Sequence, residues 1–355
     1  MDRYELRRQD YSLSEDQTEL QAVYAKFFKA RCPIDTVRAA EATGFDKSLW
    51  EQLCATGATA MALPESAGGD GAGLVELALV AEELGRAIAP VPWIEHSTAA
   101  RLLARLDALP GENSGDIAAG RRIVALDPNP APRPGPRLIP AGAVADEIVL
   151  RDGDEIVRLA FESRPTRVEN IGRLPMAWVD PAGAGVRSAL ASGPDAVAEY
   201  GRALDEWRVL TAAALIGLLD ETLRIAAEFA TTRHTLGVPI GSLQGISHPL
   251  ADIAVVVHGG RNLARRAAWF QEYEPQAQPE LPAAAFVFVT GEAPKAATMA
   301  VQTQGGLGVS AESAASAYLV RARGWSLAGG DPAVAAREIA EIVARRSTAP
   351  TAVPA

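Results

Sequence analysis

The sequence predicts an α+β protein in which two helical regions enclose a small β domain. Apolar residues recur at helical spacing towards both ends of the chain, while the middle is rich in Pro and Gly and holds short β-branched runs. We therefore expect an N-terminal helical domain (1–115), a reduced middle β domain (116–198), a C-terminal four-helix bundle (199–346) and a disordered tail (347–355). A chain of 355 residues can bury a sizeable core in such domains.

The N-terminal helices are predicted from a start signal and from periodicity. Ser14 and Gln17 have the spacing of a capping box, which begins a helix that continues to Phe28. Further helices are expected at 48–56 and 74–88. The Gly-rich segment 64–73 between them lacks a clear preceding strand, so we interpret it as a structural turn and not as a phosphate-binding loop.

The middle domain is predicted to consist of loops and short strands. Pro and Gly crowd residues 128–142, which indicates a loop. The runs 145–150 and 155–159 flank Asp152-Gly153, a pair typical of a hairpin turn. Residues 168–174 and Trp178-Val179 are candidates for additional strands.

The C-terminal region is predicted to be helical throughout. Four long helices are expected at 197–233, 243–270, 282–302 and 313–323. Asp331 followed by Pro332 combines an N-cap acceptor with Pro at the first helical position, so a final helix should run from there to about Arg346.

Composition excludes several classes of function. The net charge of −10 argues against a nucleic-acid partner, and no apolar run is long enough for a membrane span. Cys32 and Cys54 are interpreted as helical thiols and not as a disulfide framework. The four histidines lack metal-ligand spacing, so no metal site is expected. With its polar start, the chain is predicted to be cytoplasmic.

Two motifs stand out, each between two helical stretches. The first, RHTLGVPIGSLQGISHPLADIA, covers residues 233–254 and places an arginine at a helix C-terminus, where the helix dipole favours a cation. Its Gly and Pro residues end one helix before the next begins. The second, QTQGGLG, covers residues 302–308. Either motif alone would be weak evidence for a function.

Together the two motifs resemble the acyl-CoA dehydrogenase family of flavoproteins. The N-terminal run at 62–93, ALPESAGGDGAGLVELALVAEELGRAIAPVPW, resembles the same family, whereas the middle of the chain does not. The resemblance implies removal of two hydrogens from the Cα–Cβ bond of an acyl-CoA thioester. In that reaction a glutamate accepts the α-proton and FAD accepts a hydride.

The catalytic base of the family is not found at its usual positions. Gly330 stands where most members carry the glutamate, and the adjacent Asp331 is better explained as a helix cap. Some members place the base on the first bundle helix, where Trp207 occurs here. Glu206 is its neighbour, but one residue rotates a helical side chain by about 100°, and we interpret Glu206 as a solvated carboxylate. No catalytic residue is therefore assigned.

Half of the flavin site is also missing. Residues 116–198 lack the motifs with which the family's β domain holds the isoalloxazine ring. The motifs that clamp the FAD of a neighbouring subunit are retained. By the resemblance, Arg233 and Thr235 meet the pyrophosphate, Gln244 lies along the same interface, and the adenosine end is received by Gln302, Gly305 and Gly306.

The resemblance therefore implies a base-less subunit of a heteromeric enzyme. In some bacterial acyl-CoA dehydrogenases of steroid side-chain degradation, two unlike chains assemble as a heterotetramer. We expect an α2β2 complex with a catalytic partner, which holds most of the acyl-CoA and shares FAD at the interface. Two alternatives are a self-sufficient dehydrogenase with Glu206 or Asp331 as a displaced base, and a non-enzymatic scaffold.

Overall fold

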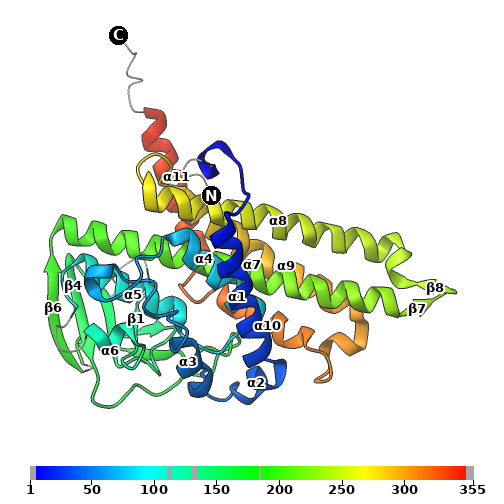
Figure 1. Cartoon of the computed structure of the whole chain (residues 1–355), viewed down its shortest axis with the longest axis horizontal. Helices are drawn as coiled ribbons and strands as arrows, with labels where there is room; N and C mark the ends of the chain where they lie inside the picture. Colours follow the sequence, from blue (N-terminus) through cyan, green and yellow to red (C-terminus); the bar gives the residue numbers. More distant parts are fainter. Residues whose placement is uncertain (1–4, 110–113, 130–134, 184, 349–355) are drawn as a thin grey trace, which may run out of the picture.

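The computed structural model describes residues 5–109, 114–129, 135–183 and 185–348. Within these ranges helices come first, strands follow, and helices complete the chain. Figure 1 shows the sheet at one end of the molecule and a helical bundle that extends from it to the opposite end. The α+β prediction is confirmed.

The N-terminal region is helical, and its first long helix begins at the predicted capping box. The Ser14 hydroxyl accepts a hydrogen bond from the backbone N–H of Gln17, and the Gln17 side chain accepts one from the backbone N–H of Ser14. The predicted structural turn is also present, since Gly71 donates to the Leu63 carbonyl. The elements are η1 (Leu6–Arg8), α1 (Glu15–Arg31), α2 (Ile34–Ala39), α3 (Lys47–Cys54), η2 (Glu65–Ala67), α4 (Leu74–Arg86), α5 (Trp93–Arg105) and α6 (Ser114–Ala118).

The middle region forms a four-stranded sheet with the order β1-β3-β4-β6 and a separate pair, β2-β5. Strands β1 and β3 run parallel, and the other pairs are antiparallel. Helix α5 packs against β1, and helix α7 of the bundle lies beside β4 and β6. The strands are β1 (Val124–Leu126), β2 (Arg137–Ile139), β3 (Glu147–Asp152), β4 (Glu155–Ala160), β5 (Ala177–Val179) and β6 (Val186–Ser192).

Three predictions for the middle region need correction. The β3–β4 turn consists of Gly153-Asp154, because Asp152 pairs with Glu155 and remains in its strand. The segment 128–142, which was predicted to be a loop, contains strand β2. Residues 130–134 of this segment lie outside the described residues. The predicted strand at 168–174 is a turn, because the Asn170 side chain bonds the backbone of residues 168 and 174.

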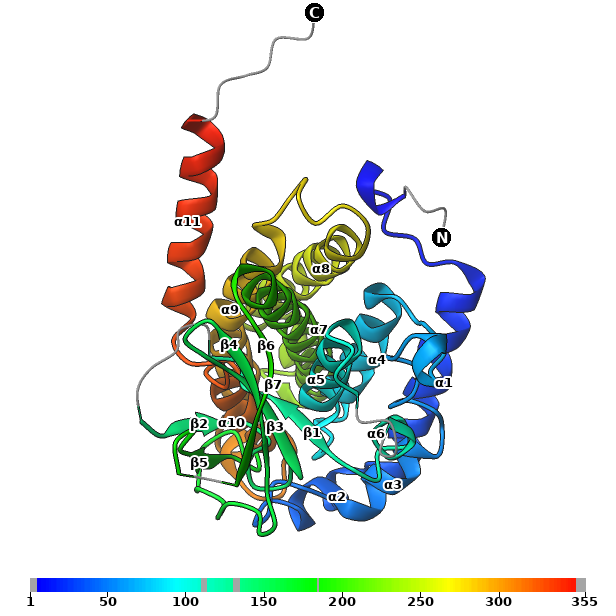
Figure 2. The same cartoon turned by 90° about the vertical axis from the view of Figure 1, so that its left-hand side faces the viewer.

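The C-terminal helices follow the predicted order closely. Helix α7 begins at Pro194, inside the segment assigned to the middle domain, and packs against α4, α8 and α9. Figure 2 shows α11 projecting from the body, and it continues through Thr348, so the first two residues of the predicted tail are helical. Residues 349–355 lie outside the described residues. The elements are α7 (Pro194–Thr232), β7 (His234–Thr235), β8 (Val238–Pro239), η3 (Ile240–Ser242), α8 (Gln244–Tyr273), α9 (Leu281–Gln304), η4 (Gly305–Val309), α10 (Ala315–Trp325) and α11 (Pro332–Thr348).

Candidate functional site

The first motif forms a hairpin at the far end of the bundle. Strands β7 and β8 pair through Thr235 and Val238, and the two residues between them, Leu236 and Gly237, both have positive φ angles. Two positive φ angles define the tight hairpin turn that matches the natural twist of paired strands. Figure 1 shows the hairpin extending beyond the ends of α7 and α8, away from the globular part of the molecule.

Leu236 at the hairpin tip is unusual in two respects. Its φ angle of 52° lies in the left-handed region, which costs a residue with a branched side chain about 1–2 kcal/mol. Its side chain is 89% exposed, which makes it the most exposed of the large hydrophobic residues described. Strained backbone conformations of this kind occur frequently at functional sites.

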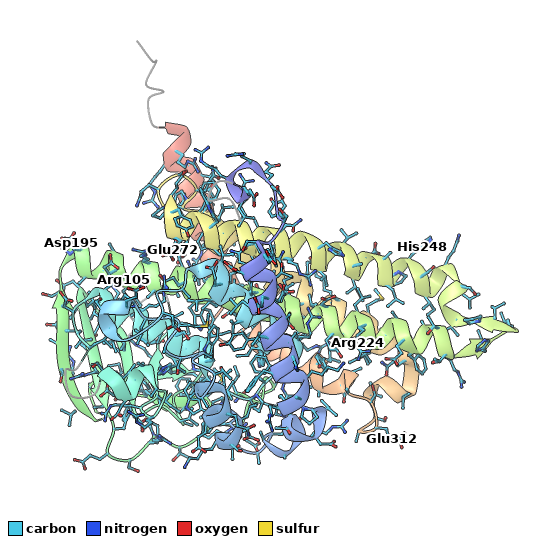
Figure 3. All side chains as sticks on the ribbon, viewed as in Figure 1. Arg105, Asp195, Arg224, His248, Glu272 and Glu312 are labelled. Atoms are coloured by element: carbon cyan, nitrogen blue, oxygen red, sulfur yellow. The ribbon has the colours of Figure 1, made fainter. Side chains whose placement is uncertain are left out.

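Arg233 is the C-cap residue of helix α7, and its guanidinium has no acidic partner among the described residues. In the described ranges no carboxylate lies within ion-pair distance of this side chain. Arg224 lies on the same helix (Figure 3). By contrast with Arg233, it pairs with Glu221 at 2.7 Å and with Glu228 at 2.9 Å. Arg233 is thus available to an external anion, and a planar guanidinium suits a phosphate group.

The second motif forms the turn between α9 and α10. Helix α9 ends at Gln304, and its C-cap residue Gly305 has φ and ψ angles of 60° and −135°, which are accessible only to Gly. Gly305 and Gly306 are exposed, and a Cβ atom on either would meet nothing within 4 Å. Gly308 has a structural role, since a Cβ there would come within 2.4 Å of the Val301 carbonyl oxygen.

The fold brings the six predicted cofactor-binding residues to the same end of the bundle (Figure 1). All six are exposed: Arg233, Thr235, Gln244, Gln302, Gly305 and Gly306. Of the six, Gln302 also lines a groove with Met299, Arg323 and Leu327.

One cavity lies between the N-terminal helices, the middle region and the bundle. This cavity measures about 50 Å³ and is lined by Glu95, Leu174, Trp207, Arg321 and Trp325, among others. Pockets for cofactors and substrates usually measure about 300–1,000 Å³. This cavity therefore has no room for an isoalloxazine ring or an acyl thioester.

Two close contacts keep this cavity small. A Cβ atom on Gly324 would come within 2.1 Å of the Gly172 Cα, and the Trp325 indole N–H donates to the Gly172 carbonyl at 3.1 Å. The Trp207 ring lies against Gly329, where a Cβ would approach the ring to 2.7 Å. Trp207, which stands where some family members carry the catalytic base, thus fills part of this cavity with its own ring. Its indole N–H donates to the Glu95 carboxylate at 3.4 Å.

The interpretation of Glu206 as a solvated carboxylate was wrong. Its side chain is buried and forms ion pairs with Arg101 at 3.3 Å, Arg105 at 2.8 Å and Arg202 at 3.8 Å. Burial alone would raise the pKa of Glu206, but these guanidinium groups outweigh it and hold the pKa below its usual range. The sequence offered no signal for this, because Arg101 and Arg105 lie on α5, far away in the chain.

Neither displaced base is placed for proton abstraction. The depressed pKa of Glu206 makes it a weak base, and its oxygens face arginines. Asp331 accepts a hydrogen bond from the Ala333 N–H at 2.9 Å and caps α11, as predicted.

Two thiols and one buried histidine have structural roles. Burial raises the pKa of Cys32 to about 12 and that of Cys54 to about 11, which keeps both thiols protonated. Burial lowers the pKa of His96 to about 4, and its ring bonds the backbone of residues 117 and 124. In the described part of the chain no cluster of side chains could hold a metal ion, and no helix is long and apolar enough to cross a membrane.

Known proteins match this chain at both ends and in its overall fold. Models of the acyl-CoA dehydrogenase N-terminal and C-terminal domains match residues 14–106 and 198–344. Acyl-CoA dehydrogenase IpdE2 of Mycobacterium tuberculosis is 32% identical over 292 residues, which cover 81% of this chain and 85% of that protein.

Two solved structures show the same arrangement. The ChsE4–ChsE5 complex from Mycobacterium tuberculosis has a TM-score of 0.83 at 25% identity, and covers 98% of this chain and 100% of the matched chain. A variant of the Tcur3481–Tcur3483 steroid ACAD has a TM-score of 0.82 at 23% identity, and covers 95% and 100%. The helix–sheet–helix fold and the matches to the N-terminal and C-terminal domain models indicate the fold of an acyl-CoA dehydrogenase. The chain belongs to the acyl-CoA dehydrogenase family.

Proposed function

We propose that this chain is the non-catalytic subunit of a heteromeric FAD-dependent acyl-CoA dehydrogenase, and that it completes the flavin site of a catalytic partner. The observation that carries the proposal is a contrast within one molecule. The chain's own cleft leaves about 50 Å³ free, whereas the family's clamp residues are exposed at the far end of the bundle. The chain on its own is then inactive.

The exposed residues fit one side of an FAD molecule and not the whole of it. The uncompensated Arg233 and the neighbouring Thr235 would bind the pyrophosphate, and Gln244 would lie along the interface. Gln302, with the open backbone of Gly305 and Gly306, would receive the adenosine end. Bound FAD would accept the hydride, and the partner subunit would supply the base that accepts the α-proton.

The relatives support a two-chain assembly and a class of substrate. The ChsE4–ChsE5 structure is a complex of two named proteins, and the Tcur3481–Tcur3483 protein is described as a steroid ACAD. By analogy, we propose an α2β2 heterotetramer that acts on a bulky acyl-CoA such as a steroid side-chain thioester. Because this chain's cleft is filled, the acyl-CoA would be bound mainly by the partner.

The Leu236→Asn variant tests the proposal with two opposite effects. Asn tolerates the left-handed backbone, so the isolated chain should become more stable by about 1 kcal/mol in urea unfolding. We propose that the exposed Leu236 side chain packs against the partner subunit beside the FAD site, so the complex of the variant with the dehydrogenase subunit that co-purifies with the chain should bind FAD more weakly.

The control is Val23→Asn, which removes an exposed valine, 52% accessible, from α1 in the N-terminal region. It should change neither the stability nor the FAD affinity appreciably. If Leu236→Asn stabilises the chain and leaves the FAD affinity of the complex unchanged, the hairpin does not serve the flavin site. The scaffold alternative would then be favoured.

A further inference from the structure

A groove of about 600 Å³ lies between the first half of α1, the Gly-rich segment before α4 and the end of α8. Figure 2 shows α4 between α1 and α8. This volume is within the range of about 300–1,000 Å³ that is usual for sites that bind small molecules. The groove shares no residue with the cavity at Trp207 or with the predicted FAD-binding residues. We refer to it as the α1–α8 groove.

The α1–α8 groove is lined by acidic side chains, and no basic side chain is among the described residues that line it. The acidic residues are Asp16, Asp70 and Glu76. Asp16 and Asp70 are exposed, and neither has an ion-pair partner in the described part of the chain. Glu76 is half-buried, and its carboxylate accepts a hydrogen bond from the neutral side-chain amide of Gln17 at 2.7 Å. The groove therefore favours a ligand with positive charge.

Aromatic side chains form another part of the lining. Tyr24 comes from α1, and Trp269 and Tyr273 come from the last two turns of α8, where their ring centroids are 5.5 Å apart. A Cβ atom on Gly73 would lie 2.8 Å from Glu76 Oε2 and 3.8 Å from the Tyr273 hydroxyl, so a carboxylate and an aromatic side chain are neighbours here. Aromatic rings attract cations through their quadrupole, and their apolar surface packs against methylene groups.

The Tyr24 hydroxyl adds a buried hydrogen-bond acceptor to the groove. Its side chain is 4% exposed, and the Thr56 hydroxyl lies 3.4 Å away. Because the Thr56 hydroxyl donates to the Leu53 carbonyl at 2.7 Å, Tyr24 can only be the donor in this contact. No described residue then donates to the Tyr24 oxygen. Burial raises the pKa of Tyr24, and the negative charge of Asp70 adds to the rise, so the hydroxyl stays neutral.

We propose that the α1–α8 groove binds a linear polyamine with three positive charges. Protonated amines are hydrogen-bond donors without acceptors, which matches a lining of three carboxylates and the Tyr24 oxygen. In the described residues no group of three acidic side chains is close enough to hold one metal ion, so charges spaced along a chain fit better than a single ion. The methylene segments would pack against the aromatic rings and against Leu20 and Val75.

Two ligands of equal length test the role of charge. Spermidine carries three amines, and 1,8-diaminooctane has a methylene group in place of the inner amine. Isothermal titration calorimetry of the full-length chain should show one spermidine bound per chain, with an affinity that falls as salt is added. The diamine should bind about tenfold more weakly, because one carboxylate loses its partner. Equal affinities of the two ligands would overturn the proposal.

Three variants locate the binding site. Asp70→Asn should weaken spermidine binding by about tenfold, and Tyr24→Phe by about fivefold, because each removes an acceptor from the groove. The control is Asp35→Asn on α2, which removes a 91% exposed carboxylate outside the groove and should leave the affinity unchanged. It accounts for general attraction to a chain with a net charge of −10.

The proposal does not rest on the flavin site, since the titration contains neither FAD nor the partner subunit. Absence of one-to-one binding of spermidine overturns it. Equal losses of affinity in Asp70→Asn and Asp35→Asn overturn it as well, because the polyamine would then bind to the acidic surface in general.

Discussion

Replacing Arg233 with alanine should weaken FAD binding to the assembled complex by roughly ten- to a hundredfold. The guanidinium lacks a carboxylate partner in the described residues, so its loss disturbs no ion pair within the chain. A charge-assisted hydrogen bond to a phosphate contributes on the order of 1.5–3 kcal/mol, which corresponds to that range of affinity. Fluorescence titration of FAD into the complex measures the effect.

Two further variants show whether the planar arrangement of the guanidinium N–H donors contributes to FAD binding in addition to the positive charge. Arg233→Lys keeps the charge and loses the planar geometry, so its FAD affinity should fall between wild type and alanine. Arg224→Ala removes an exposed arginine from the same helix that is already paired with Glu221 and Glu228, and it should leave FAD binding unchanged. Equal effects of Arg224→Ala and Arg233→Ala would mean that only the general positive charge of this end matters.

Replacing Glu206 with glutamine should destabilise the chain by about 3–5 kcal/mol at pH 7, because it leaves buried arginines without their common counter-ion. Urea unfolding measures the change. Glu228→Gln, an exposed member of a surface pair on the same helix, should change stability by less than about 0.5 kcal/mol. If Glu206→Gln and Glu228→Gln had comparable stabilities, Glu206 would not be the counter-ion that stabilises the buried arginines.

The same substitution has a defined pH dependence. The folded-state pKa of Glu206 is lowered, so its contribution to stability is present above the ordinary pKa of about 4.3 for a glutamate and disappears as pH falls through the folded value. The difference between wild type and Glu206→Gln should therefore shrink below about pH 4. In the assembled enzyme Glu206→Gln should retain turnover while folded, whereas a catalytic base at this position would not tolerate it.

Local signals in the sequence predicted most of the helices. The capping box at Ser14, the Asp331-Pro332 start and the apolar periodicity depend on residues that are close in the chain, and the structure confirms them. The short strands were harder. Strand β2 forms only because β5, about forty positions later in the chain, pairs with it, and the Asn170 turn replaced an expected strand through side-chain bonds.

The features that decide the function depend on tertiary contacts. Sequence motifs could place Arg233 and Gln302 at helix ends, and could show that Trp207 stands where a base might be expected. They could not show that the Trp207 ring fills the cleft against Gly329, nor that three arginines surround Glu206. The strain at Leu236 was equally inaccessible, because it is a property of the backbone of a tight turn.

We propose that this chain offers only one side of a flavin site. The most direct measurement is the visible absorption spectrum of the purified chain after incubation with FAD and desalting. We predict a colourless protein, because the internal cavity of about 50 Å³ cannot hold the ring and the exposed clamp covers one side only. A yellow protein with near-stoichiometric flavin would contradict the account, since the chain would then hold FAD without a partner.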